Sequence, residues 1–216
     1  MANLKIPFTQ LKFYQDGQKK AIADRIKIIE SKYGNIIRNI SNLTGVNEEI
    51  IKAFIFIESR GEETAQSPYA IGLMQVGLAT ASDALILEKS SGRLSAEEEA
   101  ILKKYMGNIP QFDKLKPNQR SIGKTWVTKD VLFKPELNIL IGSIILKQLI
   151  DEFTENGVPR LDKVAVIYNA GRFGGIGKKT IAHKGTTEEL VGILPKEPST
   201  YITKLVGTNG VLDILV

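Results

Sequence analysis

Residues 47–76 read NEEIIKAFIFIESRGEETAQSPYAIGLMQV, and this stretch decides the fold. Asn47 is a favoured N-cap for a helix, and two glutamates follow it in the first turn. Gly61 is a favoured residue for a helix end, and small and polar residues follow it as far as a Gly-Leu-Met-Gln string. The stretch therefore predicts a helix that leads into an irregular loop.

A glutamate occupies the apolar face of that predicted helix. Ile51, Phe54 and Ile55 lie three and four residues apart, and the next position on the same face is Glu58. Because burial disfavours the ionised form of a carboxyl, the pKa of Glu58 is expected to be raised. A glutamate that keeps its proton near neutral pH can act as a general acid in glycosidic cleavage. The alternative is a solvated glutamate at a helix end.

The rest of the sequence predicts a mainly α protein. Apolar residues recur at helical spacing between residues 22 and 40. Shorter helices are predicted over 81–88, 95–106, 135–153, 161–170 and 198–206. Period-2 alternation, which is typical of half-buried strands, is almost absent. Residues 107–130 and the glycine-rich stretch 171–177 are predicted to be irregular.

Composition excludes several kinds of chemistry. The 216 residues include no cysteine and one histidine, His183, so disulfides, thiolate metal sites, cysteine nucleophiles and multi-histidine metal sites are excluded. A serine–histidine triad would need His183 as its base. Carboxylates, hydroxyls and amides must therefore carry any catalysis, and no cofactor or metal is predicted.

The charge and hydropathy of the sequence limit the kinds of partner that are expected. Lys and Arg number 29 against 24 Asp and Glu, and the resulting charge of +5 is spread along the chain, which disfavours nucleic acid as a partner. The apolar stretch 137–150 is interrupted by polar residues and is too short to cross a bilayer, so no membrane insertion is predicted. Residues 1–20 show no signal-peptide pattern.

Four blocks occur in a fixed order along the chain. They are Glu58-Ser59 with Ser67 and Gly72-Leu73-Met74-Gln75, then FKPELNILIG at 133–142, then Tyr168-Asn169-Ala170-Gly171, then Leu194-Pro195 with Tyr201. This order resembles the soluble lytic transglycosylase family, which shares the lysozyme-like fold with goose-type lysozymes. The sequence departs from the family pattern at Gly77-Leu78, where a bulky residue and a proline are usual.

The resemblance implies a fold and an activity. The fold is a mainly α, lysozyme-like catalytic domain over 46–216, with an inserted segment at 84–130 and an N-terminal helical extension over 1–45. The activity is lytic cleavage of the β-1,4 bond between N-acetylmuramic acid and N-acetylglucosamine in peptidoglycan glycan strands, with a 1,6-anhydro product. A hydrolytic muramidase, and a catalytically silent wall-binding or virion structural protein on the same scaffold, are the alternatives.

The resemblance also implies roles for individual residues. Glu58 would be the single acid and base, and the Tyr168 hydroxyl would hold its orientation and its proton. The substrate-binding residues would be Ser67, Met74, Gln75, Asn169 and Tyr201. Structural roles are the alternatives: a turn serine, a core methionine, a helix cap for the asparagine and core aromatics for both tyrosines.

Two further expectations concern hydrolysis and location. If the enzyme hydrolyses its substrate, Glu62, Glu63 or Asp83 would activate water as a second carboxylate. Together with the resemblance, the lack of a signal peptide suggests a phage-encoded protein that acts from the virion or in the host cell envelope after delivery. Components of a phage tail or virion are then expected partners.

Overall fold

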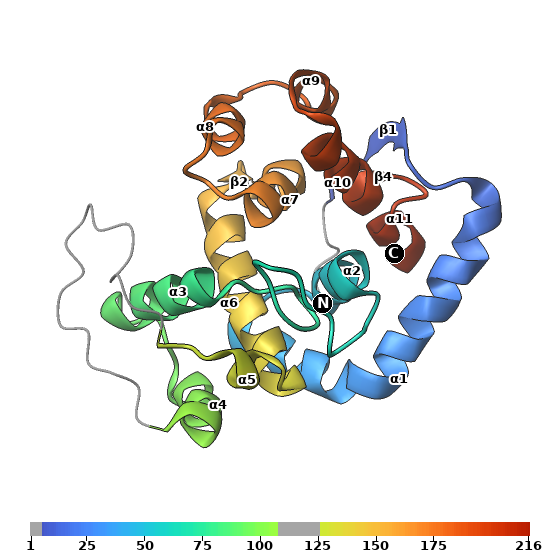
Figure 1. The fold of residues 1–216 in the computed structure, drawn as a ribbon. Helices are drawn as coiled ribbons and strands as arrows, with labels where there is room; N and C mark the ends of the chain where they lie inside the picture. The colour runs from blue at the N-terminus through green and yellow to red at the C-terminus, as the bar shows by residue number, and fades with distance from the viewer. Residues whose placement is uncertain (1–5, 108–125) are drawn as a thin grey trace.

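The computed structural model describes residues 6–107 and 126–216. Within these ranges the chain is mainly helical, with eleven α-helices, one short 3₁₀ helix and four short strands (Figure 1). This confirms the predicted mainly α class. Most of the segment 107–130, predicted to be irregular, lies outside the described residues.

The elements run in the following order along the chain. They are β1 (Thr9–Lys12), the 3₁₀ helix η1 (Asp16–Gln18), α1 (Lys19–Thr44), α2 (Glu48–Ser59), α3 (Leu78–Ser90), α4 (Ala96–Met106), α5 (Lys129–Leu132), α6 (Pro135–Glu152), β2 (Thr154–Glu155), β3 (Val158–Pro159), α7 (Leu161–Ala170), α8 (Gly175–Ala182), α9 (Thr187–Ile193), α10 (Lys196–Val206), β4 (Gly207–Thr208) and α11 (Val211–Leu215). Strands β1 and β4 pair in parallel, and β2 and β3 form a small antiparallel hairpin.

Local sequence signals fix several helix ends. The Asn47 side chain accepts a hydrogen bond from the Glu49 backbone N–H at 2.8 Å and caps α2 as predicted. Ser95 and Glu98 form the predicted capping box at the start of α4. Pro135 lies in the first turn of α6, where its missing N–H leaves no helical hydrogen bond unmade.

The glycine-rich stretch after α7 differs from the prediction. Gly175 and Gly177 belong to α8, so only residues 171–174 form the predicted loop there. Helix α9, which was not predicted, has its own sequence signal, because Thr186 and Glu189 form a capping box at its start.

Helix α6 is the centre of the molecule. It packs against α1, α3, α4, α5 and α7, and its residues 137–146 are buried (Figure 1). Helix α1 packs against both α2 and α6, and its buried side chains belong to the same core as theirs. The predicted N-terminal extension is therefore packed as part of the main body from residue 6 onward.

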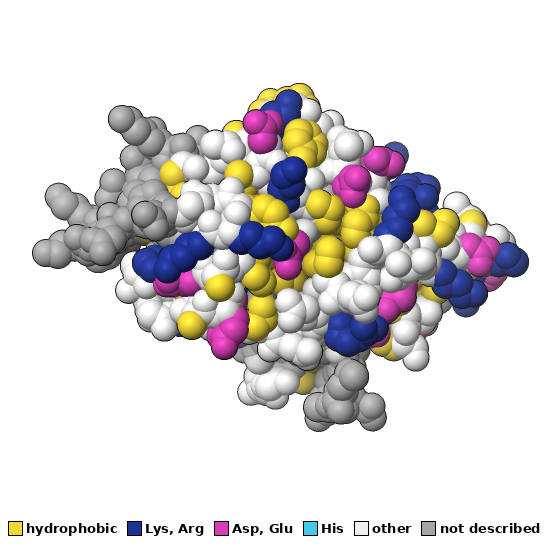
Figure 2. All heavy atoms as spheres, turned by 90° about the horizontal axis from the view of Figure 1, so that it is seen from below, with side chains coloured by type: hydrophobic (Ala, Val, Ile, Leu, Met, Phe, Trp, Pro, Cys, Tyr) yellow, Lys and Arg dark blue, Asp and Glu magenta, His cyan; other side chains and the backbone are white. Residues whose placement is uncertain are grey.

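The surface carries mixed charges. On the face shown in Figure 2, Lys and Arg side chains are interspersed with Asp and Glu around a central group of hydrophobic side chains. In the part of the chain that the structure describes, none of the helices combines the length and apolar character that crossing a membrane requires.

Candidate active site

Glu58 lies at the C-terminal end of α2, where the predicted apolar face meets the surface. The helix ends at Ser59 because Arg60 and Gly61 both adopt positive φ angles, of 54° and 77°. The Glu58 side chain is partly buried, and burial raises its pKa to about 7. A hydrogen bond from Tyr201 and the positive charge of Lys204 oppose that rise. The carboxyl group is thus close to half-protonated at neutral pH.

Tyr201 contacts the Glu58 carboxyl directly. Its hydroxyl donates a hydrogen bond of 2.5 Å to Oε1 of Glu58, across 143 residues of sequence. The tyrosine is buried on α10, with its ring centroid 6.1 Å from that of Phe54 on α2. Desolvation and the nearby glutamate both raise the pKa of the Tyr201 hydroxyl well above its usual value, so it stays a donor. This fixes one oxygen of the carboxyl group.

Tyr168 does not make the contact that the family resemblance implied. Its hydroxyl donates to the backbone carbonyl of Met74 at 2.8 Å, and its ring meets Phe54 edge-on with centroids 4.9 Å apart. Burial is the main cause of its raised pKa, and the negative charge of Glu58 adds to it. Tyr168 is therefore near Glu58 and supports the loop beside it, while Tyr201 holds the carboxyl group.

The loop at residues 71–76 is clamped between α2, α6 and α7. The buried Asn138 of α6 accepts from the Met74 backbone N–H and donates to the carbonyls of Ile71 and Leu132, each at 2.8 Å. The Ser59 hydroxyl donates to the Leu73 carbonyl at 2.7 Å. Residues of the first three sequence blocks therefore meet at this loop, and Tyr201 of the fourth block contacts Glu58.

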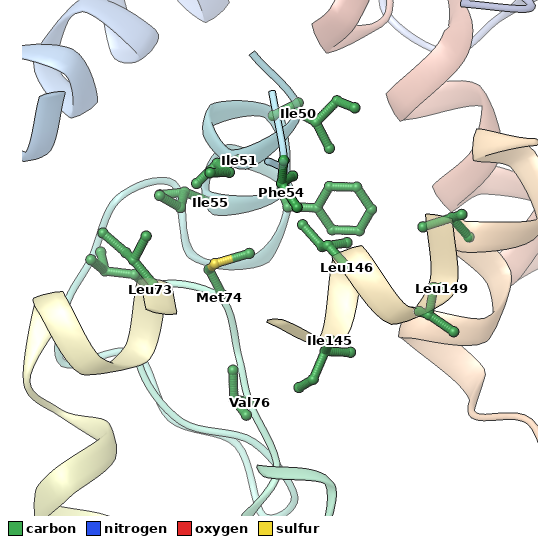
Figure 3. Packing of buried hydrophobic residues seen from close by; sticks show 14 of the residues in the cluster. Ile50, Ile51, Phe54, Ile55, Leu73, Met74, Val76, Ile145, Leu146 and Leu149 are labelled. Carbon is green, nitrogen blue, oxygen red and sulfur yellow. The ribbon is translucent and has the colours of Figure 1, made fainter. Parts of the chain in front are cut away.

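The Met74 side chain is part of the core and does not line a cleft. It is 0% exposed and lies among apolar side chains of α2, the loop and α6 (Figure 3). Gly142 of α6 makes room for it, because a Cβ atom there would lie 2.4 Å from the Met74 sulfur. The structural alternative for Met74 is thus the correct one.

Gln75 and Ser67 also stabilise the loop from within. The Gln75 amide nitrogen donates to the carbonyls of Ala65 and Gly72 at 3.0 Å each. The Ser67 hydroxyl accepts from the backbone N–H groups of the two residues after Pro68, as a turn serine does. Neither side chain hydrogen-bonds Glu58, and both shape the loop that lies next to it.

An open pocket of about 470 Å³ lies over Glu58. It is lined by Ile57, Glu58, Asn169, Lys196, Glu197, Thr200, Tyr201 and Lys204. Asn169, predicted to bind substrate, is exposed in this pocket at the end of α7. Sequence reasoning missed Lys196, Glu197, Thr200 and Lys204, although their spacing around Tyr201 places them on neighbouring faces of one helix.

The carboxylates considered for water activation are elsewhere. Glu63 accepts a hydrogen bond from Tyr33, Glu62 accepts one from Thr64, and neither they nor Asp83 lines the pocket. The second carboxylate that does line it is Glu197. His183 is half-buried, with Nε2 3.0 Å from the Thr186 carbonyl oxygen. Residues 6–107 and 126–216 contain no cluster of three or more His, Asp and Glu side chains that could hold a metal ion.

No protein-family model matches the chain, and no curated protein sequence is significantly similar to it. The site itself offers a proton donor and acceptor near neutral pH, a fixed carboxyl orientation and an open pocket with amide, hydroxyl and charged groups. That combination suits acid–base chemistry on a polar ligand.

Proposed function

We propose that this protein is a peptidoglycan lytic transglycosylase on a lysozyme-like scaffold, with Glu58 as its single acid and base. The observation that carries the proposal is the Glu58 carboxyl, whose pKa of about 7 and hydrogen bond from Tyr201 occur inside an open pocket. A glycosidase acid must be protonated when substrate binds and must give up its proton readily, and a pKa near 7 meets both needs.

The proposed reaction uses the same carboxyl group twice. Protonated Glu58 gives its proton to the glycosidic oxygen as the bond from that oxygen to C1 of the muramic residue breaks. The carboxylate that results takes the proton from the 6-hydroxyl of that residue as its oxygen bonds to C1. The substrate acetamido group supports the positive charge at C1, so the protein need not supply a second carboxylate. The products are a 1,6-anhydro end and a free 4-hydroxyl, and no water is consumed.

The other pocket residues have roles that fit this reaction. Tyr201 restricts the carboxyl to one orientation, and its donated hydrogen bond stabilises the carboxylate formed after the first proton transfer. Asn169, exposed in the pocket, offers an amide to the acetamido groups of the sugars. Tyr168 and the loop that it supports maintain the wall beside α2.

Hydrolysis is the second candidate, and a specific observation favours it. Glu197 gives the pocket a second carboxylate, in the first turn of α10, and a base at this place could activate water. The product would then be a reducing muramic end in place of an anhydro end. The two candidates share Glu58 as the acid and differ only in the nucleophile.

The chemical identity of the new ends decides between these functions. Purified protein is incubated with peptidoglycan, and the released fragments are analysed by mass spectrometry. We expect 1,6-anhydromuramic ends, which are lighter by one water than reducing ends. If only reducing ends were found, the enzyme would be a hydrolase. If no cleavage occurred, the protein would be a catalytically silent one on the same scaffold.

A pair of substitutions ties the activity to the pocket. Glu58→Gln keeps the size and polarity of the side chain but removes the proton donor, and the rate is expected to fall by about 10²- to 10⁴-fold. Glu97→Gln changes an exposed glutamate on α4 and serves as the matched control. Equal rates in both variants would refute the assignment of Glu58.

A further inference from the structure

One face of α10 directs two lysines into the pocket. Lys196, Thr200 and Lys204 follow one another at intervals of four residues, and all three line the pocket with Glu58. Positions four apart lie above one another on a helix, so the two ammonium groups lie at opposite ends of one stripe. The part of the pocket wall formed by α10 thus carries a lysine near each end, with the carboxylate of Glu197 beside the first of them.

Neither lysine has a carboxylate partner in the described part of the chain. Among residues 6–107 and 126–216, no acidic group lies within 4.0 Å of the Lys196 or Lys204 nitrogen. Glu197 is the other acidic residue that lines the pocket besides Glu58. Elsewhere in the molecule many lysines are paired, as Lys163 is with Glu155 and Lys104 with Glu136.

Lys204 also acts on Glu58 through its charge. The positive charge lowers the pKa of Glu58 and so limits the rise that burial causes. A cation at this place is compensated if the substrate brings a negative charge of its own. The two lysines, which form no ion pair in the described part of the chain, can therefore receive an anionic group of a ligand.

The N-terminal segment fixes the position of Lys204. The Lys204 nitrogen lies over the ring of Phe13, 4.8 Å from its centroid, in a cation–π contact. Phe13 follows β1 directly, and β1 pairs with β4, which begins three residues after Lys204. Phe13 also meets Tyr14 edge-on, with centroids 4.9 Å apart. The N-terminal segment, which lies outside the family resemblance, thus contacts a lysine that lines the pocket.

We propose that Lys204, supported by Lys196 and positioned by Phe13, binds a carboxylate carried by the glycan next to the scissile bond. This deepens the proposed function and rests on it. In peptidoglycan such a carboxylate comes from the free lactyl group of muramic acid or from the stem peptide attached to it. Chitin strands carry neither group, so they are poor ligands. Phe13 acts through Lys204 and is a positioning residue.

Binding to an inactive variant tests the subsite without cleavage. Glu58→Gln protein is titrated calorimetrically with a peptide-bearing peptidoglycan tetrasaccharide, the same compound with its carboxylates converted to methyl amides, a peptide-free tetrasaccharide with free lactyl groups, and chitotetraose. We expect carboxylate-bearing ligands to bind about five- to tenfold more tightly than the methyl amide and chitin ligands. Preference for the peptide-bearing or for the peptide-free ligand identifies the carboxylate that is bound.

Additional substitutions in that variant connect the preference to Lys204. Lys204→Met is expected to abolish it, Lys204→Arg to retain it, and Phe13→Leu to reduce it with little effect on chitotetraose binding. Lys32→Met, on the exposed face of α1, is the control. An unchanged preference in Lys204→Met overturns the subsite even when the wild-type protein releases anhydro ends. Failure to bind any glycan, together with no cleavage by the wild type, overturns both proposals.

Discussion

The Glu58 carboxyl lies in an apolar environment and accepts one short hydrogen bond, from Tyr201. Burial alone favours the protonated form, whereas Tyr201 and Lys204 favour the carboxylate, and the balance gives a pKa of about 7. The proposed reaction uses both forms in turn, so neither can be greatly favoured over the other. The opposing influences on this one side chain therefore match the two steps that it has to perform.

Activity is expected to depend on the protonated form of Glu58. Since its pKa is about 7, kcat/KM should be constant at lower pH and fall about tenfold for each pH unit above that value. The measurement is kcat/KM on soluble glycan strands from pH 5 to 9, with circular dichroism at each pH to show that the protein stays folded. A rate that stays constant up to pH 9 would contradict the assignment.

Replacing the two tyrosines by phenylalanine is expected to have different effects, one on the pH dependence of activity and one on stability. Tyr201→Phe removes a donor that lowers the pKa of Glu58, so the fall in activity should move to higher pH. Tyr168→Phe instead leaves the Met74 carbonyl without its donor, which should cost about 1 kcal/mol of stability and leave the pH dependence in place. Urea unfolding and pH profiles of both variants make the comparison. If Tyr168→Phe shifted the pH dependence and Tyr201→Phe did not, Tyr168 would have the role that the family resemblance implied, which is to hold the Glu58 carboxyl.

The sequence alone could indicate Glu58 but not its partner. Glu58 interrupts an apolar face that is visible within the eight residues 51–58, so local periodicity is enough to single it out. The choice between Tyr168 and Tyr201 depends on how α7 and α10 pack around Phe54, which no local pattern encodes. For the same reason Met74 was expected in the cleft, although its side chain fills the space left by Gly142.

At the scale of elements, one buried amide joins the 71–76 loop to α6. The Asn138 side chain makes three hydrogen bonds, all to backbone groups, two in the loop and one at the end of α5. Gly72 allows this approach, because a Cβ atom there would lie 2.4 Å from the Asn138 amide nitrogen. The loop is thus attached to α6 by the hydrogen bonds of Asn138 and to α2 by apolar packing and the hydrogen bond from Ser59.

Replacing that amide should loosen the loop. Asn138→Leu has a similar volume but removes the partner of the Met74 N–H and of the Leu132 carbonyl, while the Ile71 carbonyl keeps its hydrogen bond from the Val76 N–H. The free energy of unfolding should therefore fall by about 2 to 4 kcal/mol. Asn42→Leu, at an exposed position of α1, should change it by less than about 0.5 kcal/mol. The measurement is urea unfolding at fixed pH, and equal values for the two variants would show that Asn138 does not hold the loop.

Elements with local signals could be predicted, and those without could not. Capping residues mark the starts of α2 and α4, and Pro135 marks α6, so their positions follow from a few neighbouring residues. Strands β1 and β4 are short and pair across nearly the whole chain, which leaves no periodicity to detect. The cationic stripe on α10 has helical spacing, but only the fold reveals that it lines the pocket with Glu58.

At the scale of the whole molecule, residues near the N-terminus form hydrogen bonds with residues near the C-terminus. The Asn209 amide donates to the Tyr14 carbonyl and to the Asp16 carboxylate, and Thr9 donates to Glu188. Helix α1 then covers α2 and α6 with one buried face. Residues 6–45, which lie outside the family resemblance, therefore pack together with the C-terminal residues in one core.

Because of this packing, damage to α1 should destabilise the entire protein at once. Ile37→Ala truncates a side chain that is 0% exposed, so the free energy of unfolding should fall by about 2 to 5 kcal/mol in a single transition. Ile28→Ala, on the same helix but 44% exposed, is the matched control and should cost less than about 1 kcal/mol. Unfolding is followed both by far-ultraviolet circular dichroism and by fluorescence of Trp126, which lies outside α1. If α1 were an independent appendage, Ile37→Ala would separate the two signals into distinct transitions.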